Sequence, residues 1–304
     1  MDVSQLRANI LNFSLDDGPR GNQGYSRVLL QLFGFLGHGK SSFINSCKYV
    51  IDDGERFVQF AVSGDTEHGG GAMTMVRKSY DLTNNITIVD NRGYIKMTSF
   101  ERAEMYAQLG NFIPIGETVK WSDNYRDMMH RLEDAELNPN YSDFIVPILV
   151  YSATCRFSSS DKQEVQTFMD NCVRMTGVVP IVVITKKKSG NFLEIESAFK
   201  RMGAENIISI ENYTEEDHIK TQGRTRDILT IIHSALTDVT FRLGQKRDPR
   251  KDWVQRKKFL LDYIHQADRE KREQEWRQEE ERRRREEEER RKKEKEEESS
   301  CLLS

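Results

Sequence analysis

The residues from Gly34 to Ser41 carry the strongest chemical signal in this sequence. They fit G-x-x-x-x-G-K-[ST] without a mismatch and read Gly34-Phe35-Leu36-Gly37-His38-Gly39-Lys40-Ser41. Glycines let successive backbone N–H groups face phosphate oxygens, and a helix that starts at this loop, continuing with Ser42, adds positive potential. Lys40 is expected to reach the β and γ phosphates, and Ser41 to ligate Mg²⁺. The pattern predicts a nucleotide-phosphate site.

His38 lies inside this loop. Two roles are open to it: a contact with phosphate or a partner, which would add it to the nucleotide-binding residues, or a solvated filler of the loop. The second role is the one that a loop position favours.

A second short motif, Asp90-Asn91-Arg92-Gly93, follows the apolar run ITIVD. Its form is D-x-x-G, in which Asp90 would hold Mg²⁺ through water and the Gly93 N–H would sense the γ-phosphate. A plain turn at a strand end is the alternative. Tyr94 follows Gly93, and its phenol cannot orient a water as an amide does. The sequence therefore shows no water-positioning residue.

Three consecutive glycines, Gly69 to Gly71, indicate a loop between these two motifs. A switch loop must supply a hydroxyl that closes on Mg²⁺. Thr74 is the first choice for this ligand, and Thr66 is the second. A connector without any ligand is the alternative.

The base-recognition region is Ile184-Thr185-Lys186-Lys187-Lys188. Thr185 and Lys186 match the start of [NT]-K-x-D, but Lys188 stands where guanine-specific proteins have an aspartate acceptor. Glu211 or Asn212, after a later strand, could act as the acceptor instead. The ligand is therefore expected to be GTP, with ATP as the alternative that Lys188 permits.

The elements that must position these residues alternate between strands and helices. Buried apolar runs predict parallel strands, and helix-length segments with polar faces lie between them. The strands are 27–35, 86–90, 144–151, 181–185 and 207–210; the helices are 40–51, 99–109, 122–135, 160–175, 192–202 and 225–243. Residues 73–82 and the turn after them predict one antiparallel edge strand. The fold class is α/β, a doubly wound and mostly parallel sheet of the P-loop type.

These elements together resemble P-loop GTPases of the TRAFAC class. Within that class, the segments Gly37–Ser46 and Ile210–Thr214 resemble the interferon-induced protein 44 family. The resemblance covers residues 25–243. The resemblance implies a cytosolic protein linked to antiviral responses. From the motifs we expect Mg²⁺ as cofactor and GTP as ligand, and we add a homodimer through the G-domain as a further expectation.

Charge is concentrated at one end of the chain. The whole sequence is 31% charged with a net charge of −3, which argues against binding nucleic acid by bulk basicity. From 268 to 298, 28 of the 31 residues are charged. Glu281/Arg285, Glu286/Arg290 and Glu289/Lys293 are i,i+4 pairs that stabilise a single solvated helix. A disordered charged tail is the alternative.

The last four residues, Cys301-Leu302-Leu303-Ser304, have the C-a-a-X form that favours a farnesyl group on Cys301. One prenyl chain supports only reversible membrane binding, so we expect a cytoplasmic, peripheral membrane protein. Cys47, Cys155 and Cys172 are expected to be core thiols.

The predicted organisation is a lead-in (1–24), a GTPase-like domain (25–245), an amphipathic helix (246–267) whose apolar face docks on the core or a partner, a charged helix (268–298) and a prenylation signal (299–304). Two classes of function remain open. One is a slow Mg²⁺-dependent GTPase acting as a membrane-tethered switch or scaffold, and the other is a scaffold that binds nucleotide without hydrolysis.

Overall fold

The computed structural model describes residues 1–61, 76–119, 124–137 and 139–301, without the side chains of 160 and 294–301. These residues divide into two units, Met1–Leu260 and Leu261–Ser304. The predicted Mg²⁺ ligands Thr66 and Thr74 lie outside the described residues, as do residues 302–304 of the prenylation signal.

One six-stranded sheet forms the centre of the first unit, with strand order β2-β3-β1-β4-β5-β6. β1 pairs in parallel with β3 and β4, so that Leu30 lies between Ile88 and Val146. Among the strands of the described residues, only β2 is antiparallel, against β3. The predicted doubly wound, mostly parallel sheet with an antiparallel edge strand is confirmed. The strands are β1 (Arg27–Phe33), β2 (Lys78–Thr83), β3 (Ile86–Asp90), β4 (Asp143–Ser152), β5 (Ile181–Thr185) and β6 (Ile207–Ser209).

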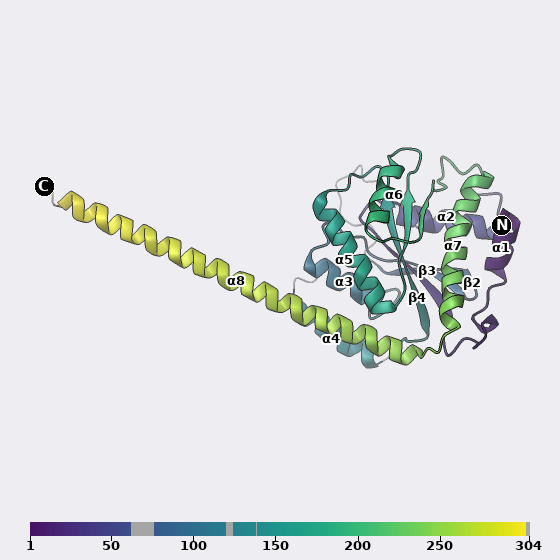
Figure 1. Cartoon of the computed structure of the whole chain (residues 1–304), viewed down its shortest axis with the longest axis horizontal. Coiled ribbons are helices and arrows are strands. Elements are labelled where there is room, and N and C mark those ends of the chain that lie inside the picture. The colour runs from purple at the N-terminus through teal and green to yellow at the C-terminus, as the bar shows by residue number, and fades with distance from the viewer. Residues whose placement is uncertain (62–75, 120–123, 138, 302–304) are drawn as a thin grey trace. The chain divides into compact units, whose positions relative to one another are not determined.

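Helices cover both faces of this sheet, as Figure 1 shows with α3 and α5 on one side of the strands and α7 on the other. The side chains of β1 pack against helices on both faces of the sheet. Phe33 packs on Phe168 of α5, whereas Leu30 belongs to the core beneath α2 and α7. The helices are α1 (Val3–Leu11), α2 (Lys40–Asp52), α3 (Ser99–Leu109), α4 (Tyr125–Leu137), α5 (Ser159–Thr176), α6 (Phe192–Arg201), α7 (Gln222–Leu243) and α8 (Pro249–Cys301), with a short 3-10 helix η1 (Leu15–Asp17).

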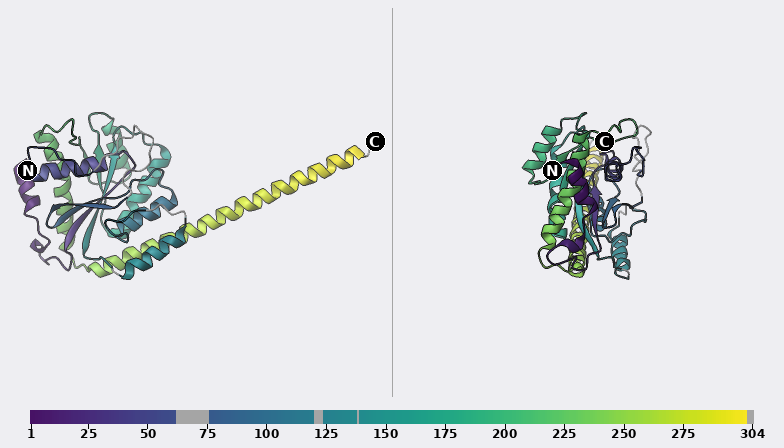
Figure 2. Two further views of the ribbon diagram at one scale, coloured as in Figure 1. Left: turned by 180° about the vertical axis from the view of Figure 1, so that it is seen from behind. Right: turned by 90° about the vertical axis from the view of Figure 1, so that its right-hand side faces the viewer.

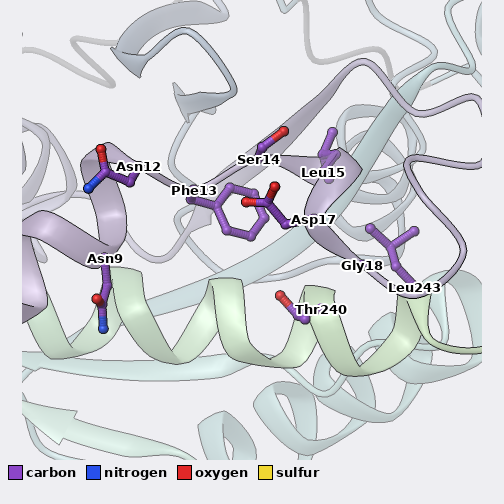
Figure 3. Close-up of a pocket in the computed structure, with 9 residues that line it drawn as sticks. All are labelled: Asn9, Asn12, Phe13, Ser14, Leu15, Asp17, Gly18, Thr240 and Leu243. Atoms are coloured by element: carbon purple, nitrogen blue, oxygen red, sulfur yellow. The ribbon is translucent and has the colours of Figure 1, made fainter.

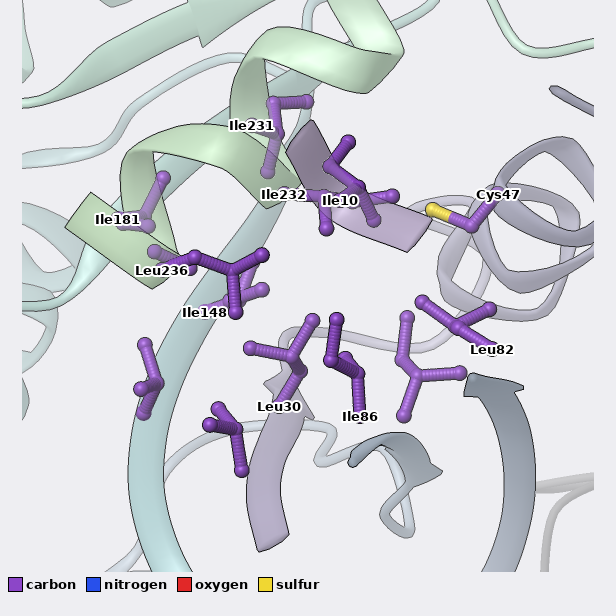
Figure 4. Close-up of a cluster of buried hydrophobic side chains, with 14 of the residues drawn as sticks. Ile10, Leu30, Cys47, Leu82, Ile86, Ile148, Ile181, Ile231, Ile232 and Leu236 are labelled. Carbon is purple, nitrogen blue, oxygen red and sulfur yellow. The ribbon is translucent and has the colours of Figure 1, made fainter. Parts of the chain in front are cut away.

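The main core lies between the sheet and the pair α2 and α7. Figure 4 shows its centre, where Leu30 and Ile86 from the strands meet Ile232 and Leu236 of α7 and Cys47 of α2. Leu30, Ile86 and Ile232 are fully shielded from solvent. Burial of each such side chain contributes about 1.5–3 kcal/mol, so this core fixes the strand ends from which the loops of the site emerge.

Helix α1 was not expected, because residues 1–24 read as a polar, turn-rich lead-in. Leu6 and Ile10 lie one helical turn apart and are both buried, and the helix packs on α7 (Figure 2). Asp2 caps its start by accepting a hydrogen bond from the Gln5 N–H at 2.8 Å. A helix of nine residues is marginal on its own, so α1 depends on this tertiary contact.

The residues of helix α8 up to Leu260 belong to the first unit, and those from Leu261 onward belong to the second. In the first unit, the Trp253 ring lies 5.5 Å from the Phe112 ring and the Phe259 ring 5.6 Å from that of Tyr106. The second unit is a single charged helix, as the sequence predicted, with pairs such as Glu281/Arg285 at 2.6 Å. Within the described part of the chain, no helix has the length and hydropathy needed to span a membrane.

Candidate nucleotide site

The loop from Gly34 to Gly39 connects β1 to α2, which starts at Lys40. Gly34 has a φ of +153°, and a side chain there would collide with the Val150 carbonyl oxygen of the neighbouring β4. Gly39, the residue before the helix, has a φ of +87°, a left-handed value that favours glycine. Both glycines are therefore required by the path of the backbone around the place predicted for the phosphates.

Lys40 is the central cation of this loop. Its Nζ donates hydrogen bonds to the carbonyl oxygens of Gly34 and Phe35, each at 3.0 Å. Burial lowers the pKa of Lys40 to about 8, against an opposing effect of the nearby Asp90 carboxylate. A desolvated ammonium has little water to lose when an anion approaches, which favours strong phosphate contacts.

The D-x-x-G motif lies directly beside the loop. Ser41 Oγ donates a hydrogen bond to Asp90 Oδ2 at 2.9 Å, and a Cβ on Gly93 would lie 2.7 Å from Lys40 Nζ. The structure thus brings Lys40, Ser41, Asp90 and Gly93 together. A hydroxyl beside a carboxylate is a donor set that suits Mg²⁺. Ser41 and Asp90 would hold the ion, which would supply positive charge next to the phosphates.

Two residues missed by sequence reasoning, Asn45 and Arg77, make contacts in the described residues that flank 62–75. Asn45 of α2 accepts hydrogen bonds from the N–H groups of Phe60 and Ala61 at 2.9 and 2.7 Å. After the segment, the buried Arg77 donates to the side chains of Asn91 and Gln31 at 2.9 and 3.1 Å. The one feature of the sequence that could have indicated these contacts was the polar residue Asn45 on an apolar face of its helix.

Thr185 and Lys186, at the end of β5, contact the backbone of the phosphate loop. Thr185 Oγ1 donates to the His38 carbonyl at 2.8 Å, and Lys186 Nζ to the Gly37 carbonyl at 3.3 Å. The predicted base-recognition strand end and the phosphate loop are thus adjacent. Ser42 lies in the first turn of α2, where its carbonyl accepts from Ser46 Oγ at 2.8 Å.

Glu211 and Asn212 point to different places, which separates the two candidates for a base acceptor. Asn212 faces the loop and α2, since its Nδ2 donates to the Gly39 carbonyl at 3.2 Å and its Oδ1 accepts from Ser46 Oγ at 3.4 Å. Glu211 instead accepts from the Lys188 backbone N–H at 2.8 Å. A carboxylate therefore lies beside the position where Lys188 replaces the expected aspartate.

His38 is not a solvated filler, because only 6% of its surface is exposed. Its ring lies edge-on to Tyr151 at 4.8 Å, and its two nitrogens contact Ser152 and Cys155. The residues it contacts are over a hundred positions away in the sequence. Cys155 is only half-buried, so the expectation of a core thiol holds for Cys47 and Cys172 but not for Cys155.

Tyr94 is completely buried and packs against Phe35, with the ring centroids 4.4 Å apart. Burial raises the pKa of its phenol well above the usual value. The next residues are held by Glu101, whose carboxylate accepts from the N–H groups of Ile95 and Lys96 at 3.1 Å. Tyr94 thus takes part in packing.

A separate pocket of about 300 Å³ lies between the N-terminal segment and α7. Figure 3 shows Asn9, Phe13 and Asp17 on one side of it and Thr240 on the other. None of its lining residues belongs to the predicted nucleotide site.

No protein-family model matches this sequence, and no curated protein matches it. Three solved structures illustrate its similarity to known folds. The first is from Thermus thermophilus, with 15% identity over 59% of this chain and a TM-score of 0.31, and this chain spans only 22% of its length. The second comes from work on the GTPase activity and dimerization of the chloroplast translocon components atToc33 and psToc159, with 13% identity over 74% of this chain and 87% of that one and a TM-score of 0.41. The third is a mutation variant of SsGBP, with 16% identity, 71% and 57% coverage and a TM-score of 0.33. These values are too low to transfer an activity.

Proposed function

We propose that this chain is a GTP-binding protein of the P-loop type, with Mg²⁺ as cofactor and slow hydrolysis of the nucleotide. The observation that carries the proposal is the meeting of four motif residues in space: Lys40, Ser41, Asp90 and Gly93. Their order on strand, loop and helix is the one in which P-loop proteins hold phosphates and Mg²⁺.

Slow rather than fast hydrolysis follows from the surroundings of Gly93. Fast P-loop GTPases orient the attacking water with a side chain near this glycine or with a residue from a partner. Tyr94 is buried in packing and His38 is turned toward β4. Neither is available for the role, so hydrolysis, if catalysed, depends on a residue outside this group or on a second subunit.

Guanine is the base that the geometry favours, through Glu211. Its carboxylate is the acceptor beside Lys188, and a carboxylate accepts from the two adjacent N–H groups of guanine, whereas adenine offers a different pattern. Asn212 takes the separate role of holding the loop through Gly39.

A decisive experiment compares GTP and ATP in binding and single-turnover hydrolysis with the full chain. We expect tight binding of GTP, weaker binding of ATP and slow turnover that Lys40→Ala abolishes. Tight binding without turnover would favour the alternative, a scaffold that nucleotide only stabilises. Absence of binding by either nucleotide would refute the proposal. The exposed His130→Asn is a suitable control variant.

Membrane tethering by a farnesyl group on Cys301, a homodimer through the G-domain and a role in innate immunity stay predictions. Intact-mass measurement of the protein from animal cells tests the first, and light scattering with and without GTP tests the second. An unmodified Cys301 would remove the proposed anchor.

A further inference from the structure

His38 combines a position in the phosphate loop with a side chain that points away from it. Its Nδ1 accepts a hydrogen bond from the Ser152 backbone N–H at 3.2 Å, and its Nε2 lies 3.3 Å from Cys155 Sγ. Ser152 is the last residue of β4, and Cys155 follows it by three positions. The ring is further enclosed by Phe35, at 5.2 Å between centroids, and by Tyr151.

The backbone of residue 38 is held as well. Its carbonyl accepts from Thr185 Oγ1 at the end of β5, so the residue is tied to two neighbouring strands of the sheet. Gly37 and Gly39 on either side have positive φ values of +73° and +87°. Between two such flexible residues, the fixed position of His38 determines how the loop turns.

We propose that His38 is a positioning residue that sets the conformation of the phosphate loop by fastening it to the ends of β4 and β5, and that it is not a phosphate ligand. This inference rests on the proposed nucleotide-binding function. It assigns to the imidazole a role in phosphate affinity that is exerted through the backbone of Gly37 and Gly39.

The ionisation of the ring agrees with this role. Burial, together with the charges of Lys40 and Lys186, lowers the pKa of His38 to about 3. The ring is therefore neutral at physiological pH, and because Nδ1 accepts from Ser152, its one proton is on Nε2. That N–H donates to the sulfur of Cys155. A phosphate ligand would instead be expected to be a protonated and accessible imidazole.

Nuclear magnetic resonance of the full chain without nucleotide tests the geometry directly. With ¹⁵N-labelled histidine, His38 should give the signals of a neutral ring protonated on Nε2, with no change from pH 5 to pH 8. His38→Asn assigns the signal by its loss. A ring that titrates near the ordinary pKa of about 6.5 would overturn the proposal. This measurement does not depend on whether the chain binds nucleotide.

A binding series tests the effect on the loop. His38→Ala should weaken GTP and GDP binding about tenfold relative to the wild type, the effect of losing roughly one buried hydrogen bond. GMP should be much less affected because it lacks the β and γ phosphates. His38→Asn should recover most of the affinity, since its side-chain oxygen can accept from Ser152.

The outcomes separate the two proposals. Equal losses for GTP, GDP and GMP, or no loss for any of them, would overturn the positioning role, provided that thermal unfolding shows His38→Ala to be folded. If the wild type binds none of the three, the proposed function fails while the resonance result still decides the geometry. Exposed His130→Asn should match the wild type throughout.

Discussion

Ser41 Oγ donates a hydrogen bond to Asp90 Oδ2 at 2.9 Å, although the two residues are 49 positions apart. The contact joins the first turn of α2 to the end of β3, and it places a hydroxyl and a carboxylate at one point. We expect Ser41→Ala to weaken GTP binding in the presence of Mg²⁺ by about tenfold, with little change in EDTA. Titration of a fluorescent GTP analogue with and without Mg²⁺ measures this. An equal loss in both conditions would show that Ser41 has no part in holding the ion.

Phosphate affinity should decrease at alkaline pH because of Lys40. In the free protein the pKa of Lys40 is lowered to about 8, and phosphate oxygens would raise it by favouring the ammonium. The contribution of the Lys40 ammonium to phosphate affinity is therefore fully present below about pH 8. As the pH rises above this value the contribution is lost, and the affinity falls by at most about tenfold per pH unit. Affinity measured from pH 7 to pH 9.5 tests this. Lys40→Met should bind weakly and show no such slope; a slope of equal size in Lys40→Met would assign the effect to another group.

The base acceptor can be identified by exchanging its chemistry. Glu211→Gln replaces a carboxylate that accepts two hydrogen bonds by an amide that accepts and donates. The variant should lose roughly 10- to 100-fold in GTP affinity and gain affinity for XTP, whose C2 carbonyl accepts where guanine donates. Competition between GTP and XTP for the variant gives the ratio of the two affinities. Unchanged GTP affinity would exclude Glu211 as the acceptor, and Glu215→Gln on the exposed loop nearby is the matched control.

Arg77 should contribute strongly to stability. It is completely buried, with its guanidinium surrounded by neutral oxygens that include Asn91 and Asn111, and burial lowers its pKa to about 9. Arg77→Met leaves these acceptors without their donor, and the relief of burying a charge offsets part of that cost. We expect a loss of about 3 kcal/mol in the free energy of unfolding. Urea denaturation compares it with Arg250→Met, an exposed control; a variant as stable as the wild type would show that the cost of burying the charge dominates.

The second unit should depend on its ion pairs for helicity. Glu280/Arg284 and Glu281/Arg285 are both paired at 2.6 Å, and such pairs contribute about 0.2–0.5 kcal/mol each. Reversing the four arginines Arg282–Arg285 to glutamate should reduce the circular-dichroism signal of the full chain at low salt. Replacement by lysine keeps the charges and should preserve the signal. Equal signals for the two variants would show that the pairs are not needed.

The fold was largely predictable because its central strands β1, β3, β4 and β5 are buried on both sides. Runs such as 144–151 have no polar alternation, and this is the pattern of a parallel sheet covered by helices. Helix α1 was not predicted because its apolar residues lie in a lead-in that is polar and rich in turn residues, and Leu6 and Ile10 are buried through its packing on α7. In the candidate site, spacing predicted Lys40, Ser41 and Asp90, and the structure places Ser41 and Asp90 in contact. It could not give the orientation of His38 or Asn212, because the groups that these side chains contact come from distant parts of the chain.

The close approach of the Gly34 and Val150 backbones limits which mutations this protein can accept. No side chain separates the two backbones there, since even a Cβ at residue 34 would collide with the Val150 carbonyl oxygen. The position of the phosphate loop is thus set by direct packing of the Gly34 backbone on the Val150 backbone. Substitutions elsewhere in β1 or β4 alter how firmly the sheet holds together, but position 34 tolerates no gradual variation. Any larger residue would displace the loop and the strand at once.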